Sequence, residues 1–367
     1  MDDYTTFPDR EQPFQNVPFS SDFRGAESSL SLDKLAQLPT RASDAGLRSP
    51  FLGVVDPVKT LVNRTRSKSL DFVIKGRLMN DQAIRETSPL HRSYVKSTAC
   101  NSVLTQEDGK IKGFYCKQRW CAVCNRIRTG VLFNKYEEVI RGFEDRYLVS
   151  LTLENCKAED LPETIDEMIR LFGLCAMSIK QTEKLEFKAL RKMEVTYNSR
   201  FNSYHPHFHV ICKGKETAEK LIKQWLIKVN KYSKNKEKCR AVEDAQDMTP
   251  CDENTMKELF KYFTKLINEQ RLYPKVLDVI FQAMKGRRTF QAYLPKYLQK
   301  KVKNIGDEED LVLERGTPAI TRLNENILWD YIPEARNYVD KDTGELLTDY
   351  KPTETFERLL KKLGDSG

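Results

Sequence analysis

Three of the four histidines in the chain fall within five residues, at His205, His207 and His209. The residues that follow them, Val210 and Ile211, predict a β-strand, in which side chains alternate between the two faces of a sheet. The three imidazoles therefore share one face. Residues two apart lie about 6.7 Å apart along a strand, so His207 and His209 can converge on one ion. His205 is too distant, and we expect it to be an outer or entry residue.

Pro206 interrupts this segment. Because proline cannot donate a backbone hydrogen bond, we expect the strand proper to begin near His207. Two histidines are too few for a tight metal site, so a carboxylate on a neighbouring strand is needed. Glu194 is the candidate, since it is the acidic residue in the apolar and β-branched run at 189–197. The alternatives are a chance histidine cluster on an ordinary strand and a solvent-facing Glu194.

A second set of reactive groups lies on a helix predicted over residues 254–267. Glu258, Tyr262 and Lys265 share one face at i, i+4 and i+7, and Lys261 borders that face. A tyrosine phenolate can attack phosphorus, lysines can neutralise phosphate charge, and a carboxylate can act as general base for a second nucleophile. The alternative is an ordinary solvated helix face.

Four of the nine cysteines, Cys100, Cys116, Cys121 and Cys124, follow the spacing C-x15-C-x4-C-x2-C. Four thiolates at such spacing can enclose a tetrahedral structural zinc ion, so we predict a zinc site here. The alternative is a group of unmetallated core thiols. The other five cysteines are scattered and are interpreted as ordinary buried thiols.

Alternating strands and helices must position these groups. Strands are predicted over residues 147–153, 189–197, 207–212, 240–244 and 287–293, and helices over 127–143, 163–179, 216–232, 254–267 and 274–284. This alternation indicates an α+β or α/β sandwich. Residues 1–60 are expected to be mostly disordered, with one short helix at 31–38, and the chain is expected to be irregular after residue 306.

Composition excludes several classes of protein. The 367 residues suit one large domain or two smaller ones. No apolar run approaches the length of a membrane span, and the first residues do not have the pattern of a signal peptide. We therefore expect a cytoplasmic protein, in which cysteines serve as thiols or metal ligands rather than disulfides.

The net charge of +8 conceals a segregation of charge along the chain. Residues 61–135 hold 15 basic and 5 acidic residues, residues 211–240 hold 10 and 3, and residues 271–305 hold 9 and 1. Residues 306–367, by contrast, hold 8 basic and 15 acidic residues. Basic blocks favour a polyanionic partner such as DNA, because each phosphate contact releases counterions.

Taken in order, these segments resemble the replication initiators (Rep) of small rolling-circle plasmids. These form a branch of the HUH endonuclease superfamily, here the subgroup with an upstream cysteine cluster. The resemblance rests on the cysteine segment 114–126, the strands at 147–155 and 191–198, the His-hydrophobe-His segment 205–211, the tyrosine segment 258–265 and the basic stretch 284–293. One departure is Leu153-Glu154-Asn155, where the family usually has Thr-Pro-Asn or similar.

The resemblance implies an α+β HUH fold, an antiparallel sheet flanked by helices, and a role for each residue. His207 and His209, with Glu194 as third ligand, would bind Mg²⁺ or Mn²⁺ at the scissile phosphate. Tyr262 would attack origin DNA that is single-stranded or extruded as a hairpin, and free a 3′-OH primer. Glu258 would activate water for the terminating cleavage. Lys261 and Lys265 would steady phosphate, and a host helicase and polymerase would be partners.

The resemblance also implies a division of the chain. We expect a largely disordered or irregular region at 1–90, a Cys-rich zinc-binding segment at 91–130, a nicking and joining domain at 131–305 and an acidic extension at 306–367. One alternative with the same chemistry remains, an HUH transposase or relaxase. A second alternative, of another class, is a non-catalytic zinc-bearing DNA-binding protein. A metallohydrolase that uses His207 and His209 without a covalent step is a third alternative.

Overall fold

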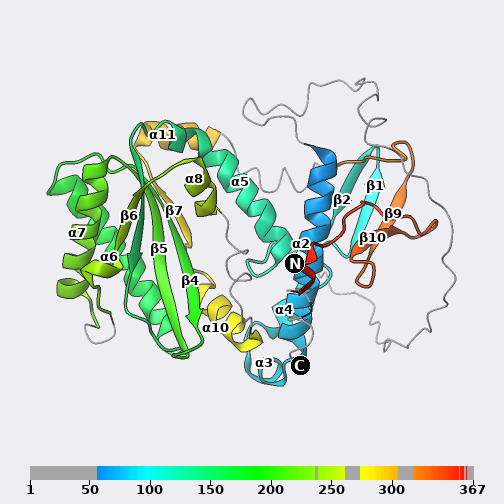
Figure 1. The fold of residues 1–367 in the computed structure, drawn as a ribbon, viewed down its shortest axis with the longest axis horizontal. Coiled ribbons are helices and arrows are strands. Elements are labelled where there is room, and N and C mark those ends of the chain that lie inside the picture. Colours follow the sequence, from blue (N-terminus) through cyan, green and yellow to red (C-terminus); the bar gives the residue numbers. More distant parts are fainter. Residues whose placement is uncertain are drawn as a thin grey trace, which may run out of the picture. The chain divides into compact units, whose positions relative to one another are not determined.

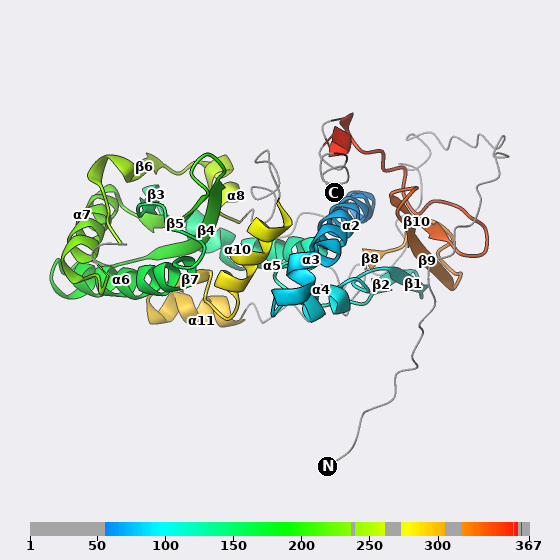
Figure 2. The ribbon, with the colours of Figure 1, turned by 90° about the horizontal axis from the view of Figure 1, so that it is seen from below.

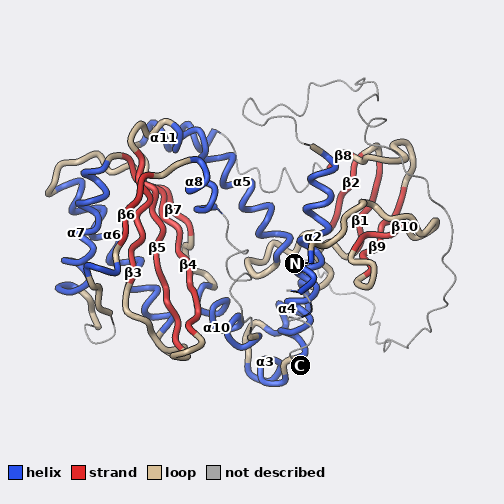
Figure 3. The backbone as a smooth tube through the Cα atoms, viewed as in Figure 1, coloured by secondary structure: helices blue, strands red, loops and turns tan. Residues whose placement is uncertain are grey.

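Helices and antiparallel strands alternate through the central part of the chain, as the sequence predicts (Figure 1). The computed structural model describes residues 56–235, 239–260, 273–304, 317–354, 356–358 and 361. Within them, the strands form two five-stranded sheets in which every strand pair is antiparallel (Figure 3). The predicted α+β class is therefore confirmed.

Sheet B has the strand order β6-β3-β5-β4-β7. Its strands are β3 (Arg146–Thr152), β4 (Ala189–Asn198), β5 (Ser203–Lys213), β6 (Asp247–Pro250) and β7 (Phe290–Tyr293). Four predicted strands are confirmed, but the one at 240–244 is wrong. Residues 243–245 form a short 3-10 helix, and the Gln246 side chain accepts the backbone N–H of Thr152 at 2.8 Å. The edge strand β6 therefore begins only at Asp247.

The helices around sheet B are α5 (Ala122–Arg141), α6 (Leu161–Gln181), α7 (Lys215–Tyr232), α8 (Glu253–Phe260), α10 (Pro274–Met284) and α11 (Lys296–Asn304). Four of the five predicted helices are confirmed. The fifth, at 254–267, is confirmed as far as residue 260, because residues 261–272 lie outside the described residues.

The two faces of sheet B have different coverings. On one face, Phe208 of β5 packs against Phe172 of α6 and Trp225 of α7, with ring centroids 5.4 and 5.9 Å apart. On the other face, buried residues of α8 share a core with Leu190 of β4 and Ile211 of β5. This second core covers the part of that face near the C-terminal end of β5.

Pro206 lies inside β5, so the expectation that the strand begins near His207 is wrong. The backbone N–H of Tyr204 donates to the carbonyl of Cys156, and alternate residues of a strand point their N–H groups to the same side. The nitrogen of Pro206 therefore faces the β3 side. Pairing with β3 ends at Thr152, opposite His207, so no ladder hydrogen bond is lost there.

Sheet A has the order β10-β9-β1-β2-β8. Its strands are β1 (Val103–Glu107), β2 (Lys110–Gly113), β8 (Thr317–Pro318), β9 (Ile327–Ile332) and β10 (Asn337–Asp340). Leu104, Ile111, Trp329 and Tyr338 form its buried core. The prediction of an irregular extension after residue 306 is therefore wrong for the described part, because residues 317–340 supply three strands that pair in one sheet with β1 and β2.

Helices α2 (Pro57–Asn80), α3 (Gln82–Thr87) and α4 (His91–Ser97) precede both sheets in the chain. Asp56 caps α2 by accepting the N–H of Lys59 at 3.2 Å, and Pro57 occupies the first turn, where its missing N–H costs nothing. The expected irregular region is thus wrong from residue 57, while the helix expected at 31–38 lies outside the described residues. Figure 2 shows α2 and α3 beside α10, and Leu70 and Ile74 share a core with Phe281.

None of the helices in the described part of the chain combines the length and the apolar character that a membrane span requires.

Candidate active site and metal centre

Glu194, His207 and His209 come together on two adjacent strands of sheet B. Glu194 of β4 pairs with His207 of β5, and Lys192 pairs with His209, so all four side chains share one face. The Nε2 atoms of His207 and His209 lie 3.7 and 3.5 Å from Oε2 of Glu194. We call these three residues the Glu-His-His group; its ligand atoms all lie within 4.8 Å of one another.

The hydrogen bond of His207 directs a lone pair toward this group. Nδ1 of His207 lies 3.1 Å from the carbonyl oxygen of His205, so Nδ1 donates and Nε2 of the neutral ring carries the lone pair. Nδ1 of His209 lies 3.3 Å from Oγ of Ser150. Nε2 of His207 and Oε2 of Glu194 thus face each other as acceptors, which is favourable only with a shared cation or proton between them. Donors about 2.1 Å from one ion stand about 3.0–3.4 Å apart, so the group fits a divalent ion after a slight contraction.

Lys192 belongs to the site although the sequence argument did not select it. Its Nζ lies 2.6 Å from Oε1 of Glu194, which leaves Oε2 facing the histidines, and both side chains are buried. Burial raises the pKa of Glu194, but the neighbouring imidazoles of His207 and His209 and the charge of Lys192 outweigh it, so the net pKa is lowered. The carboxyl is therefore ionised at neutral pH. The available signal was the period of two in β4, which places Lys192 beside Glu194.

His205 lies outside the group, as expected for an outer or entry residue. Its Nδ1 donates to Oδ1 of Asn155 at 2.8 Å, and its ring stands 5.3 Å from that of His207. Burial, together with neighbouring His207, lowers the pKa of His205 to about 4, so its imidazole is neutral at pH 7. Asn155 comes from the segment that departs from the usual family motif, and here it orients His205.

The predicted tyrosine helix begins on the same face as the Glu-His-His group. Leu259 and Phe260 of α8 pack with Ile211, which follows His209 on that face of β5. Glu258 lies on α8. Lys261, Tyr262 and Lys265 lie outside the described residues.

Cys100, Cys116, Cys121 and Cys124 converge as the sequence predicts, and we call them the cysteine cluster. Cys100 follows α4, Cys116 follows β2, Cys121 is the N-cap of α5 and Cys124 lies in its first turn. Gly113 lets the segments of Cys100 and Cys116 approach closely, because a Cβ there would lie 2.6 Å from the side chain of Leu104 and 2.7 Å from that of Asn101, and one of these side chains would have to shift.

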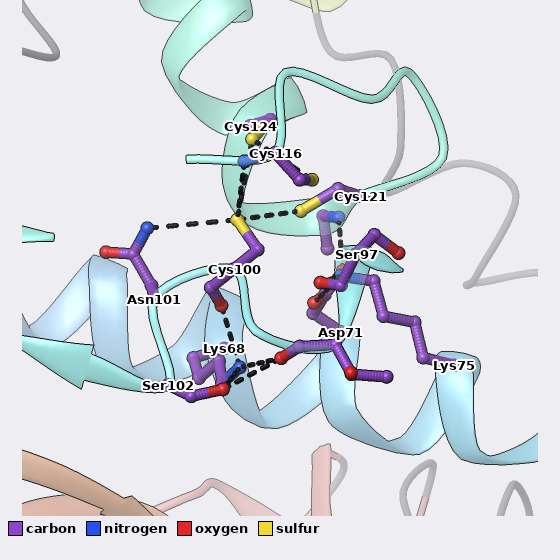
Figure 4. Close-up of polar contacts among 12 residues, drawn as sticks. Lys68, Asp71, Lys75, Ser97, Cys100, Asn101, Ser102, Cys116, Cys121 and Cys124 are labelled. Carbon is purple, nitrogen blue, oxygen red and sulfur yellow. Dashed lines mark hydrogen bonds and ion pairs between the residues drawn. The ribbon is translucent and has the colours of Figure 1, made fainter. Parts of the chain in front are cut away.

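The sulfur positions of the cysteine cluster fit a tetrahedral ion (Figure 4). The Sγ atom of Cys100 lies 3.5 Å from that of Cys121 and 3.6 Å from that of Cys124, and Cys116 and Cys124 are 3.7 Å apart. Four sulfurs each about 2.3 Å from a zinc ion would stand about 3.8 Å apart. All four cysteines are free thiols, and these separations are far longer than a disulfide bond.

A family model described as "Replication protein" matches residues 110–339. A curated "Protein rep" from Streptococcus pneumoniae serotype 2 is 27% identical over 123 residues, which are 31% of this chain and 38% of that protein. "Protein rep" from Bacillus amyloliquefaciens is 30% identical over 120 residues, or 30% of this chain and 34% of that protein.

A third "Protein rep", from Staphylococcus aureus, is 30% identical over 124 residues, which are 54% of its length. The chain thus spans little more than a third of the first two relatives. No solved structure gives a significant match. Because the family model matches more than half of the residues, and in agreement with the resemblance of its motifs, the chain belongs to the replication protein family.

Proposed function

We propose that the chain initiates rolling-circle replication of a plasmid by nicking one strand of the origin and rejoining it at termination. The observation that carries this proposal is the convergence of Glu194, His207 and His209 on one sheet face, next to the core that includes Leu259 and Phe260 of α8, the helix that precedes Tyr262 in the sequence. Family membership supports the replication role. Basic blocks at 61–135, 211–240 and 271–305 support DNA as the partner.

A Mg²⁺ or Mn²⁺ ion bound by the Glu-His-His group would polarise the scissile phosphate. Tyr262 attacks that phosphorus: its phenol releases a proton, an O–P bond forms, and the P–O3′ bond breaks. The 5′ phosphate stays on the tyrosine, while the 3′ oxygen takes up a proton and becomes the primer for a host polymerase. Bond making balances bond breaking, so the later rejoining step needs no external energy source.

Other residues complete the cycle. Glu258 serves as the general base that activates water for the terminating cleavage, because a single tyrosine cannot perform both cleavages on its own. Lys261 and Lys265 neutralise charge on the phosphate. A host helicase separates the strands. The nicking and joining domain occupies residues 131–305, and its described core is sheet B with its helices.

We assign a structural role to a zinc ion in the cysteine cluster. Four thiol ligands complete a tetrahedron and leave no position for a substrate, which is typical of structural sites.

The nucleophile is tested by trapping the covalent adduct. Wild-type protein, incubated with Mn²⁺ and single-stranded origin DNA, should give a protein–DNA species that survives SDS on a denaturing gel. Tyr262→Phe should lose the adduct completely, because phenylalanine has no nucleophilic oxygen. Tyr273→Phe, a nearby exposed tyrosine, is the matched control and should retain it. An adduct of normal yield in Tyr262→Phe would refute the assignment and favour another nucleophile or a non-covalent metallohydrolase.

A further inference from the structure

Helix α2 buries a row of charged side chains. Arg64, Lys68, Asp71 and Lys75 stand at i, i+4, i+7 and i+11, so they share one helix face, which we call the α2 stripe. Their exposed fractions are 4%, 2%, 1% and 2%. Charged side chains are almost never buried to this degree unless partners offset the loss of hydration. The groups that these four side chains contact therefore indicate what the stripe does.

Lys68, Asp71 and Lys75 of the α2 stripe point at the segments that carry the cysteine cluster (Figure 4). Nζ of Lys68 donates to the carbonyl of Cys100 at 2.7 Å, to the carbonyl of Thr98 at 3.2 Å and to Oγ of Ser102 at 3.0 Å. All three protons of this ammonium are thus used on the chain around Cys100. Within the described part of the chain, no side-chain carboxylate is among its acceptors.

Asp71 and Lys75 hold further chain beside the cluster, whereas Arg64 contacts β8. Oδ1 of Asp71 accepts the backbone N–H of Ala122 at 2.8 Å, which fixes the start of α5 between Cys121 and Cys124. Lys75 pairs with Asp71 at 2.5 Å and donates to the carbonyl of Ser97 at 2.5 Å. Arg64 donates to Oγ1 of Thr317 at 2.8 Å. Lys68, Asp71 and Lys75 therefore hydrogen-bond to the backbone of the segments that carry or border the cysteine cluster.

The charges of the two partners balance. Three cations and one carboxylate give the α2 stripe a charge of +2. Metal-bound thiols are deprotonated, so four of them around a zinc ion carry a net charge of −2. Four neutral thiols carry none, and would leave the excess positive charge of the stripe buried without compensation.

We propose that the α2 stripe is the counter-charge of the metal-loaded cysteine cluster, so that zinc binding and docking of α2 are one coupled step. This inference rests on the structural zinc proposed above. Lys68 is its central positioning residue, because it contacts the chain at Cys100 and its removal leaves the Asp71–Lys75 pair intact. Zinc loss releases α2, and loss of the Lys68 charge weakens the hold on zinc.

Lys68→Met provides the test, since methionine preserves much of the length of lysine and removes its charge. Lys59→Met, an exposed lysine of the same helix, is the control. Zinc release to a chromogenic chelator should be at least about 10-fold faster from Lys68→Met than from wild type, and unchanged in Lys59→Met. Equal release rates in Lys68→Met and wild type would overturn the coupling while leaving zinc binding intact.

A second measurement needs no substitution and decides the matter if Lys68→Met fails to fold. Hydrogen exchange of wild-type protein should accelerate across α2 when zinc is removed, and should slow again when zinc is restored. Exchange of α2 that does not respond to zinc would overturn the proposal. Wild-type protein that never holds zinc would instead refute the structural zinc site itself, which is a distinguishable result.

Discussion

The cysteine cluster takes its ligands from a loop, a strand end and the start of a helix, whereas the Glu-His-His group stands on two paired strands. The cluster has four ligands, and charges on a neighbouring helix are buried against its backbone. The Glu-His-His group has three ligands, and the side chain of His209 is 17% exposed. A closed site with saturated ligands holds a fold together, whereas a site with open positions can accept water or a phosphate.

The largest effect is expected at the Glu-His-His group, where a substitution should lower DNA cleavage and leave the cysteine cluster unchanged. His207→Ala or His209→Ala should lower origin cleavage more than about 100-fold, because loss of a direct ligand exceeds the effect of losing its hydrogen-bond partner. Binding to duplex origin DNA and the zinc content should remain near wild type. Gel assays of cleavage and of binding measure both quantities. Equal losses of cleavage and binding would show that the histidines serve structure, and the contrast between the sites would fail.

A smaller effect, on stability rather than chemistry, is expected at the cysteine cluster. Cys121→Ser should abolish stoichiometric zinc and lower the free energy of unfolding by about 4 kcal/mol or more, as loss of a structural metal does. Denaturant unfolding in the presence of zinc, with metal analysis of the purified protein, tests this. Cys175→Ser, at a buried cysteine of α6, should retain zinc. Full zinc content in Cys121→Ser would exclude a four-thiolate site.

The smallest effect is expected at Ser150, which contacts a histidine of the Glu-His-His group. Ser150→Ala should weaken Mn²⁺ binding by up to about 10-fold, because the hydroxyl beside Nδ1 of His209 helps to fix its ring. Titration calorimetry measures the affinity. Thr249→Ala, at an exposed hydroxyl on the neighbouring strand β6, should leave it unchanged. An equal loss in the two variants would assign the effect to sheet B in general.

The sequence predicts the ligands better than it predicts their supports. His207, His209 and Glu194 follow from a period of two and from residue chemistry, which a strand expresses directly. Lys192 shares this period, but a lysine next to a carboxylate resembles an ordinary surface pair, and only strand pairing shows that both are buried. Pro206 misled the prediction of the strand start, because a proline costs a ladder hydrogen bond only where a partner lies opposite its nitrogen, and the sequence does not show that β3 ends before that point.

Helix α2 shows a deeper limit of sequence reasoning. Amphipathic helices are found by their apolar face, but α2 buries charges as well, and its basic residues look like a solvated or DNA-facing surface. Arg64, Lys68 and Lys75 are among the 15 basic residues counted at 61–135, yet they face the chain around the cysteine cluster. Sheet A was missed for a different reason, since its strands are short and its two hairpins, β1–β2 and β9–β10, lie far apart in the sequence.

The pairing of β1 with β9 sets the order in which the protein is completed during its synthesis. Gln106 of β1 pairs with Ile327 of β9, whereas every strand of sheet B has been made once Tyr293 has left the ribosome. Domains generally fold as the chain emerges, so sheet B can pair first, whereas the hairpin of β1 and β2 must wait for its outer partners β9 and β8, which are made later. A nascent or truncated chain that stops before residue 327 would carry an unpaired edge of β1. Such an edge is a template for aggregation.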